Sequence, residues 1–119
     1  MTKKVEVNSK GTNKNIKAHI LSDEEMREIG FTDRNPKNWY FCKSVDGWCS
    51  FNVTIPKDGS DIEIITLDEM FGQPYDWQYI LKKSPDFECA LKIKEETEKW
   101  MSYLIVHGVL SGWNHGDYI

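Results

Sequence analysis

The stretch NWYFCKSVDGWCSFNVTIP at residues 38–56 constrains the fold more than any other part of the chain. Asp46-Gly47 lies between two runs of aromatic and β-branched residues and predicts a tight β-hairpin, because both residues tolerate the positive φ of a two-residue type I′ turn. Such a turn fixes the register and pairs Val45 with Trp48. We therefore expect an antiparallel sheet built around this hairpin.

This register places large apolar side chains on both faces of the hairpin. A further strand at residues 61–67, entered through the turn PKDGS, extends it into a meander with Ile64 opposite Val53. One face then holds Tyr40, Cys42, Phe51, Val53, Ile55, Ile62 and Ile64, and the other holds Trp39, Phe41, Val45, Trp48, Ile65 and Leu67. A long helix is expected to cover the first face. The second needs a cover too, since leaving the rings of Trp39, Phe41 and Trp48 in water forgoes on the order of 12 kcal/mol of burial.

Two kinds of cover fit the second face. The short helices of the chain itself would make its rings part of the core. A second subunit or a partner protein would instead make Trp39, Phe41 and Trp48 a binding surface. Phe41 is central in its strand and is expected to behave as core. The two tryptophans lie near opposite ends of the hairpin, and either Trp39 or Trp48 is expected at a contact surface.

The remaining elements follow from caps and periodicity. Alternating residues predict a first hairpin from strands at residues 3–8 and 14–21. The capping box Ser22-Asp-Glu-Glu25 predicts a short helix that ends at Gly30. Proline at a first helical position predicts helices over residues 74–83 and 85–107, the second capped by Ser84.

These elements predict one α+β domain over residues 1–119, with a mainly antiparallel sheet of four to five strands, a long C-terminal helix and two short helices. Residues 1–13 and 112–119 show no clear period and are expected to be flexible. A truncation of residues 113–119 is therefore expected to leave the fold intact.

The charge of the chain bears on its partners. The formal net charge is −4, although residues 1–17 carry five lysines against one glutamate. The rest of the chain is strongly acidic and repels a phosphate backbone, so no nucleic acid is expected as a partner. A basic or amphipathic protein, or a second copy of the chain, fits better.

Motifs for catalysis or metal binding are absent from the sequence. Cys42, Cys49 and Cys89 lack zinc-site spacing, and neither a disulfide, a metal nor a cofactor is expected. His115 with Asp117 is the best acid–base pair for an enzyme, the least favoured reading. A ligand pocket lined by the rings of Trp39, Tyr75 and Trp77 is the stronger alternative.

Nothing in the sequence predicts export or a membrane span. The start MTKKVEVNSKGTNKN is charged but has no apolar region, and no apolar run approaches the ~20 residues of a membrane helix. We therefore expect a cytoplasmic protein.

The run HILSDEEMREIGF, with NWYFCKSV, FNVTIP and LDEMFGQPYDWQYIL after it, resembles small uncharacterised proteins of low-GC Gram-positive bacteria and their prophages. The resemblance covers residues 16–81. It implies a small accessory protein of a mobile element and no particular activity. The leading hypothesis is thus a non-enzymatic acidic binding protein, such as an inhibitor or immunity-type antagonist.

Overall fold

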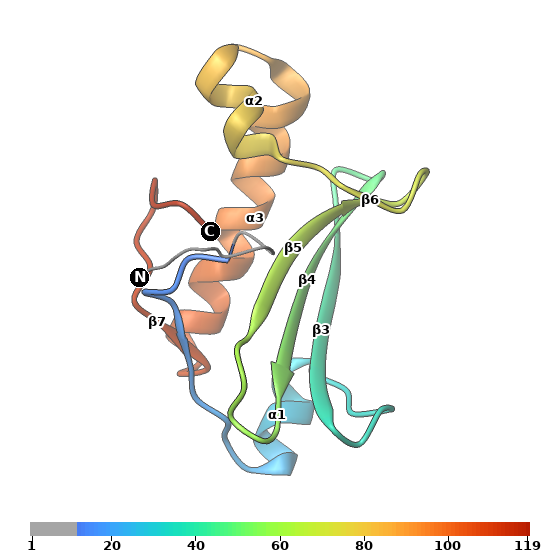
Figure 1. The fold of residues 1–119 in the computed structure, drawn as a ribbon, viewed down its shortest axis with the longest axis vertical. Coiled ribbons are helices and arrows are strands. Elements are labelled where there is room, and N and C mark those ends of the chain that lie inside the picture. Colours follow the sequence, from blue (N-terminus) through green and yellow to red (C-terminus); the bar gives the residue numbers. More distant parts are fainter. Residues whose placement is uncertain (1–11) are drawn as a thin grey trace.

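A four-stranded antiparallel sheet in the order β3-β4-β5-β6 forms one layer of the molecule (Figure 1). Its strands are β3 (Asn38–Val45), β4 (Cys49–Pro56), β5 (Glu63–Asp68) and β6 (Gln73–Pro74). A two-stranded sheet pairs β2 (Lys17–Ala18) with β7 (Leu110–Ser111). The helices of the described residues, 12–119 of this computed structural model, are α1 (Asp23–Ile29), α2 (Trp77–Lys83) and α3 (Glu88–Val106).

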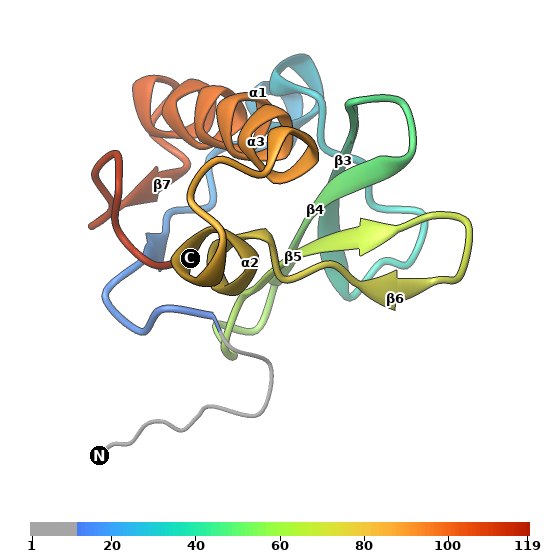
Figure 2. The same ribbon diagram turned by 90° about the horizontal axis from the view of Figure 1, so that it is seen from above.

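The predicted α+β class is confirmed, with the long helix α3 packed against the four-stranded sheet. Figure 2 shows the helices on one side of this sheet, which leaves its other side open. The buried side chains of α3 follow helical spacing and are Ala90, Ile93, Thr97, Glu98, Met101 and Leu104. They pack over the inward face of the hairpin, so the core lies between these two layers.

The predicted turn of the hairpin is wrong by one residue. Asp46 and Gly47 do adopt positive φ (52° and 76°), but Val45 pairs with Cys49 and not with Trp48. Trp48 is therefore a third loop residue. Because side chains alternate along a strand, this single insertion moves the whole of β3 to the opposite face relative to β4.

The corrected register gives the sheet one apolar face. Trp39 lies opposite Ile55 and Phe41 opposite Val53. The large apolar residues of β3 and β4 thus share the buried side: Trp39, Phe41, Val45, Cys49, Phe51, Val53 and Ile55. Tyr40 and Cys42, which were predicted on that side, lie on the other. A separate second apolar face does not exist, and the helices of the chain cover the rings.

The β4–β5 register and the start of α1 agree with the sequence prediction, whereas α2 and α3 begin later than predicted. Val53 does pair with Ile64, as predicted. The capping box of Ser22 and Glu25 forms at the start of α1. Pro74 lies in β6 and not in a helix, so α2 begins at Trp77 behind the side-chain cap of Asp76. The long helix likewise starts three residues later than predicted, at Glu88.

Only the second strand of the predicted N-terminal hairpin lies within the described residues. Its predicted first strand, residues 3–8, lies outside the described residues, as do residues 1–11 of the expected flexible start. The predicted strand at 14–21 is reduced to β2, which pairs with β7 from the other end of the chain.

The C-terminal tail does not behave as predicted. Trp113 and Ile119 are 4% and 9% exposed and belong to the core. The backbone N–H of Asn13 donates to the carbonyl of Ile119 at 2.9 Å. Gly112 has φ +86° and lies so close to the Asn15 carbonyl that an added Cβ would be 2.0 Å from its oxygen. The tail is thus part of the packed domain and not the flexible segment that was expected for residues 112–119.

Candidate binding surface at the end of the sheet

The end of the sheet near the β3–β4 loop carries two stacked rings. Trp48, the extra loop residue, packs edge-on against Tyr75 with ring centroids 4.8 Å apart. Its Nε1 donates to an Asp46 carboxylate oxygen at 3.3 Å. Both rings are half-buried: they pack against the core and are partly exposed to solvent. Of the three predicted partner-binding residues, Trp48 alone reaches this surface.

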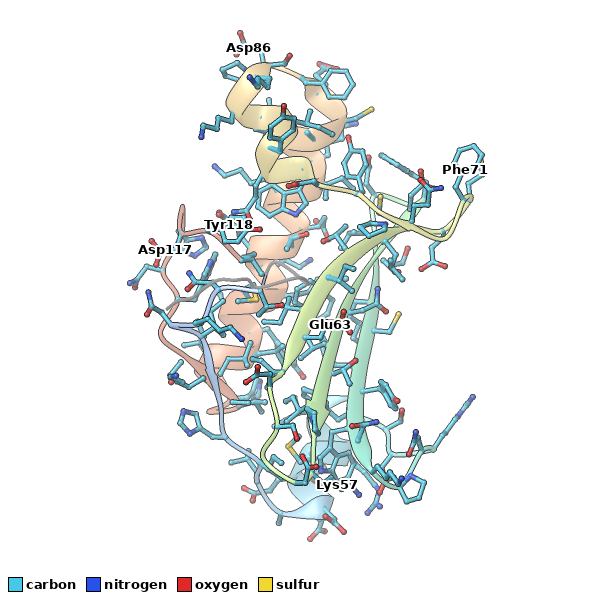
Figure 3. The ribbon with its side chains drawn as sticks, in the orientation of Figure 1. Lys57, Glu63, Phe71, Asp86, Asp117 and Tyr118 are labelled. Carbon is cyan, nitrogen blue, oxygen red and sulfur yellow. The ribbon has the colours of Figure 1, made fainter. Side chains whose placement is uncertain are left out.

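The loop between β5 and β6 adds two exposed apolar side chains at the same end of the sheet. Met70 is 78% exposed and Phe71 is 71% exposed. Figure 3 shows Phe71 at the outer end of this loop, pointing away from the molecule. Glu69 N–H donates to the Trp48 carbonyl at 3.0 Å, which ties the β5–β6 loop to the β3–β4 loop. We call residues 46–48 and 68–75 the loop end of the sheet.

Three carboxylates lie at the loop end. Burial of the Cys49 thiol, together with the negative charges of Asp68, Asp46 and Glu69, raises its pKa to about 11. Burial also raises the pKa of the Tyr75 hydroxyl, with smaller contributions from Cys89, Cys49 and then Asp68. Among residues 12–119, no lysine or arginine forms an ion pair with these carboxylates, so the loop end combines apolar side chains with negative charge.

The other end of the sheet is closed by the chain's own cations. Trp39 is 1% exposed, and the Lys57 ammonium lies 4.4 Å from its ring centroid, with the Arg27 guanidinium at 5.4 Å. Asp33 pairs with Lys57 at 3.0 Å and with Arg27 at 3.2 Å. These two partners hold the pKa of the Asp33 carboxyl below its usual value, with the Lys57 hydrogen bond as the largest cause.

The predicted interface residues Trp39 and Phe41 are buried. Phe41 is 1% exposed and packs against the rings of Phe31, Phe51, Trp100 and Tyr103. Neither Phe41 nor Trp39 offers surface to a partner in this fold. The expectation for Phe41 as core agrees with its position, whereas Trp39 lies in the core and not at a contact surface.

The structure does not assemble the predicted ligand pocket. Trp39 pairs with Ile55 of β4, whereas the N–H of Tyr75 bonds to Thr66, which pairs with Phe51. Four residues of β4 separate the two positions, or about 13 Å along the strand. Trp39 and Tyr75 therefore cannot line one small pocket.

Trp77 instead lines a different hollow, of about 290 Å³, between α2, α3 and the tail. Its other lining residues are Gln78, Leu81, Lys94, Glu98, Gly116 and Tyr118. The volume is at the lower limit for a pocket that encloses a small organic ligand.

His115 and Asp117 do not form the predicted acid–base pair. The Asp117 carboxylate accepts the N–H of Asn114 at 3.0 Å and so closes a turn of the tail. The His115 ring bonds to α3, through Glu98 and Ser102. Sequence reasoning missed both residues, although their spacing of four places them on one face of the predicted helix.

Residues 12–119 hold neither a cluster of metal ligands nor a membrane-spanning helix. Within that range, no group of three or more His, Cys, Asp or Glu side chains could hold a metal ion. None of the helices in the same range is long and apolar enough to cross a bilayer.

Comparison with known proteins supports the fold alone. No protein-family model matches the chain, and a search of curated proteins finds no match. The structure is similar to the crystal structure of a DUF1831 family protein from Lactobacillus plantarum, a low-GC Gram-positive bacterium. The TM-score is 0.62 at 13% sequence identity, over 79% of this chain and 82% of the other. At this identity the likeness extends to architecture and not to activity.

Proposed function

We propose that this chain is a small cytoplasmic binding protein that docks onto another protein through the loop end of its sheet. The observation that carries the proposal is the pair Met70 and Phe71, both more than two-thirds exposed at the tip of one loop. Large adjacent apolar side chains are costly to leave in water, and they are typical anchors of interfaces.

The geometry of the loop supports this role. The Asp68 carboxylate accepts the N–H of Met70 at 2.9 Å and that of Phe71 at 3.4 Å. The Gly72 N–H donates to the Asp68 carbonyl at 2.7 Å. The two apolar side chains thus project from a turn that is already hydrogen-bonded, so a partner would pay little conformational entropy to order it.

The charges around the loop narrow the class of partner. Among residues 12–119, no lysine or arginine forms an ion pair with Asp46, Asp68 or Glu69. A complementary surface has an apolar pocket for Phe71 and a rim of lysine or arginine. Charges of this kind steer encounter and select the partner more than they add affinity.

An antagonist of a basic protein fits this description. In the bacterial and prophage context that the sequence resemblance implies, a small acidic protein that blocks a basic site on a larger one is a coherent role. The proposal needs no chemistry at the loop end, only shape, apolar contact and charge.

The test uses a defined probe, a fluorescein-labelled synthetic helical peptide with leucines on one face and lysines on the other. Its affinity is measured by fluorescence anisotropy for the wild type, Phe71→Ser and Val106→Ser. Val106 is 81% exposed on α3, away from the loop end, and serves as the matched control. We expect Phe71→Ser to weaken binding about tenfold or more, equal to ~1.4 kcal/mol, and Val106→Ser to leave it unchanged. Equal affinities for the three proteins would reject the proposed surface.

A further inference from the structure

A chain of hydrogen bonds links a hydroxyl, an imidazole and a carboxylate between α3 and the tail. The Oγ of Ser102 lies 2.9 Å from Nε2 of His115. The Nδ1 of the same ring lies 3.1 Å from Oε1 of Glu98. Each ring nitrogen of His115 therefore has one partner, and the order is hydroxyl, imidazole, carboxylate.

Two elements supply these groups, and the His115 side chain is 68% exposed whereas that of Glu98 is 11% exposed. Glu98 and Ser102 are one turn apart on α3, so their side chains share a face. The second oxygen of Glu98 accepts the Gly116 N–H at 3.1 Å, which fixes the backbone next to His115. The buried Trp113 packs its ring 5.1 Å from the imidazole centroid.

The carboxylate decides the protonation pattern of the neutral imidazole. An ionised carboxylate only accepts hydrogen bonds, so Nδ1 of His115 carries the proton toward Glu98. The lone pair on Nε2 is then free to accept the hydroxyl proton of Ser102. This is the arrangement in which an imidazole acts as general base for a serine nucleophile.

A second serine–histidine pair in the molecule shows what the carboxylate adds. Ser111 Oγ lies 2.9 Å from Nε2 of His19, the same distance as in the first pair. No carboxylate within residues 12–119 bonds to the His19 ring. The two pairs thus differ in the group that orients the imidazole.

We propose that Ser102 is a nucleophile for acyl transfer from small carboxylic esters, with His115 as its base and Glu98 as the positioning residue. The Ser102 oxygen bonds to the acyl carbon while its proton passes to Nε2 of His115. The bond between the acyl carbon and the ester oxygen breaks, and His115 returns the proton to the leaving alcohol. Water then cleaves the acyl-serine by the same steps and restores the hydroxyl.

The neighbouring hollow suits a small apolar acyl or alcohol group. Glu98 and Gly116 line it together with the apolar surfaces of Trp77 and Leu81. Glu98 belongs both to the hollow and to the hydrogen-bonded chain, so the hollow adjoins the carboxylate end of that chain. This inference concerns the tail side of α3 and is independent of the loop end of the sheet.

The test treats the wild-type protein with p-nitrophenyl acetate and maps acetyl groups by peptide mass spectrometry. Acetylation of exposed lysines gives the internal reference. We expect an acetyl group on Ser102 and none above background on Ser111. Ser102 acetylated no more than Ser111, together with p-nitrophenolate release no faster than in buffer alone, overturns the proposal without any variant.

Variants separate catalysis from a structural role. His115→Gln, whose amide keeps a hydrogen-bonding group beside α3, should lower Ser102 acetylation about tenfold or more. Ser111→Ala should leave Ser102 acetylation unchanged, and Glu98→Gln should reduce it several-fold. Circular dichroism establishes that each variant is folded. The proposal is also overturned if Ser102 is acetylated at the same rate in the wild type and in a folded His115→Gln variant.

Discussion

Trp39 and Trp48 lie at opposite ends of one hairpin, and different groups cover their rings. Trp39 is buried, and its ring lies beside Lys57 and Arg27, whose charges Asp33 balances. Trp48 is half-buried, packs on Tyr75 and donates to Asp46. The first end of the sheet is neutralised by the chain itself. The second carries exposed apolar groups and carboxylates that form no ion pair with a lysine or arginine among residues 12–119.

The difference assigns separate roles to the two ends. Figure 3 places Lys57 and Phe71 at opposite ends of the sheet. At the Lys57 end, aromatic surface is covered and charge is balanced, as expected of a stable core boundary. At the loop end, a basic, apolar partner would supply cations for the carboxylates and a cover for the exposed apolar side chains. Predictions that compare stability with binding at the two ends can break this assignment.

The largest effect should come from Phe41. Its ring is enclosed by four other aromatic side chains, and truncation to alanine leaves a cavity that helices α1 and α3 cannot fill. We expect Phe41→Ala to lower the free energy of unfolding by about 3–5 kcal/mol, measured by urea denaturation. Phe71→Ser at the loop end should change it by less than about 0.5 kcal/mol. Comparable losses in the two variants would contradict the division.

Removal of residues 113–119 should have a similar effect. It exposes the surface that Trp113 and Ile119 cover and removes the bond from Asn13 to Ile119. The expected loss is about 3 kcal/mol or more, seen as a lower melting temperature in calorimetry. Tyr118→Ala is the control, because that side chain is 54% exposed. A truncated chain that melts with the wild type would show that the tail is not part of the core.

A smaller effect is expected at the Lys57 end. Lys57→Met keeps the apolar stem over the Trp39 ring but removes the charge, at a cost of about 0.5–1 kcal/mol. Urea denaturation at pH 7 measures it. The double change Lys57→Met with Asp33→Asn should show whether the pair is coupled, since the two losses should then not add.

The pH dependence of the same end follows from Asp33. Its folded pKa lies below the unfolded value near 3.8, so its stabilising contribution is present above that value. The contribution is lost as the pH falls below 3.8 and through the folded pKa. Asp33→Asn should therefore remove part of the loss of stability between pH 5 and pH 2, measured as melting temperature against pH. Parallel curves for variant and wild type would contradict the ion-pair account.

The smallest effect concerns thiol chemistry at the loop end. The pKa of Cys49 is raised to about 11 and the side chain is buried, whereas Cys42 and Cys89 are exposed. Iodoacetamide at pH 8 should therefore modify Cys42 and Cys89 and spare Cys49 in the folded protein. Peptide mass spectrometry after short exposure measures the three rates. Rapid modification of Cys49 would show that the β3–β4 loop opens readily.

The hairpin shows how far the sequence can predict this fold. The positive φ of Asp46 and Gly47 followed from residue type, and so did the antiparallel pairing. The third loop residue did not, because local turn chemistry tolerates either length. What selects Trp48 as a loop residue is tertiary: only that register places Phe41 and Phe51 together under α3. The requirement that the sheet has one apolar face predicts the hairpin register better than the turn residues do.

The sites were harder to predict than the fold. β2 and β7 contain two residues each, and such short strands carry no period to detect. The contact between the tail and α3 brings His115 to Glu98 and Ser102, which are 17 and 13 residues away in sequence. The spacing of Glu98 and Ser102 was visible, but nothing in it indicated which residue would come to lie beside them. Met70 and Phe71 were likewise visible as a pair without any sign that they would be exposed.

The most direct test of the two-ended account follows the tryptophan indole N–H signals in a nitrogen–proton correlation spectrum. The chain has five tryptophans, and the signals of Trp39 and Trp48 are assigned with single Trp→Phe variants. On titration with the unlabelled Leu/Lys helical peptide, the Trp48 signal should shift until binding saturates, while the Trp39 signal stays in place. A saturable shift of Trp39 with Trp48 unmoved, or no shift of either at saturation, would contradict the assignment of the loop end as the binding surface.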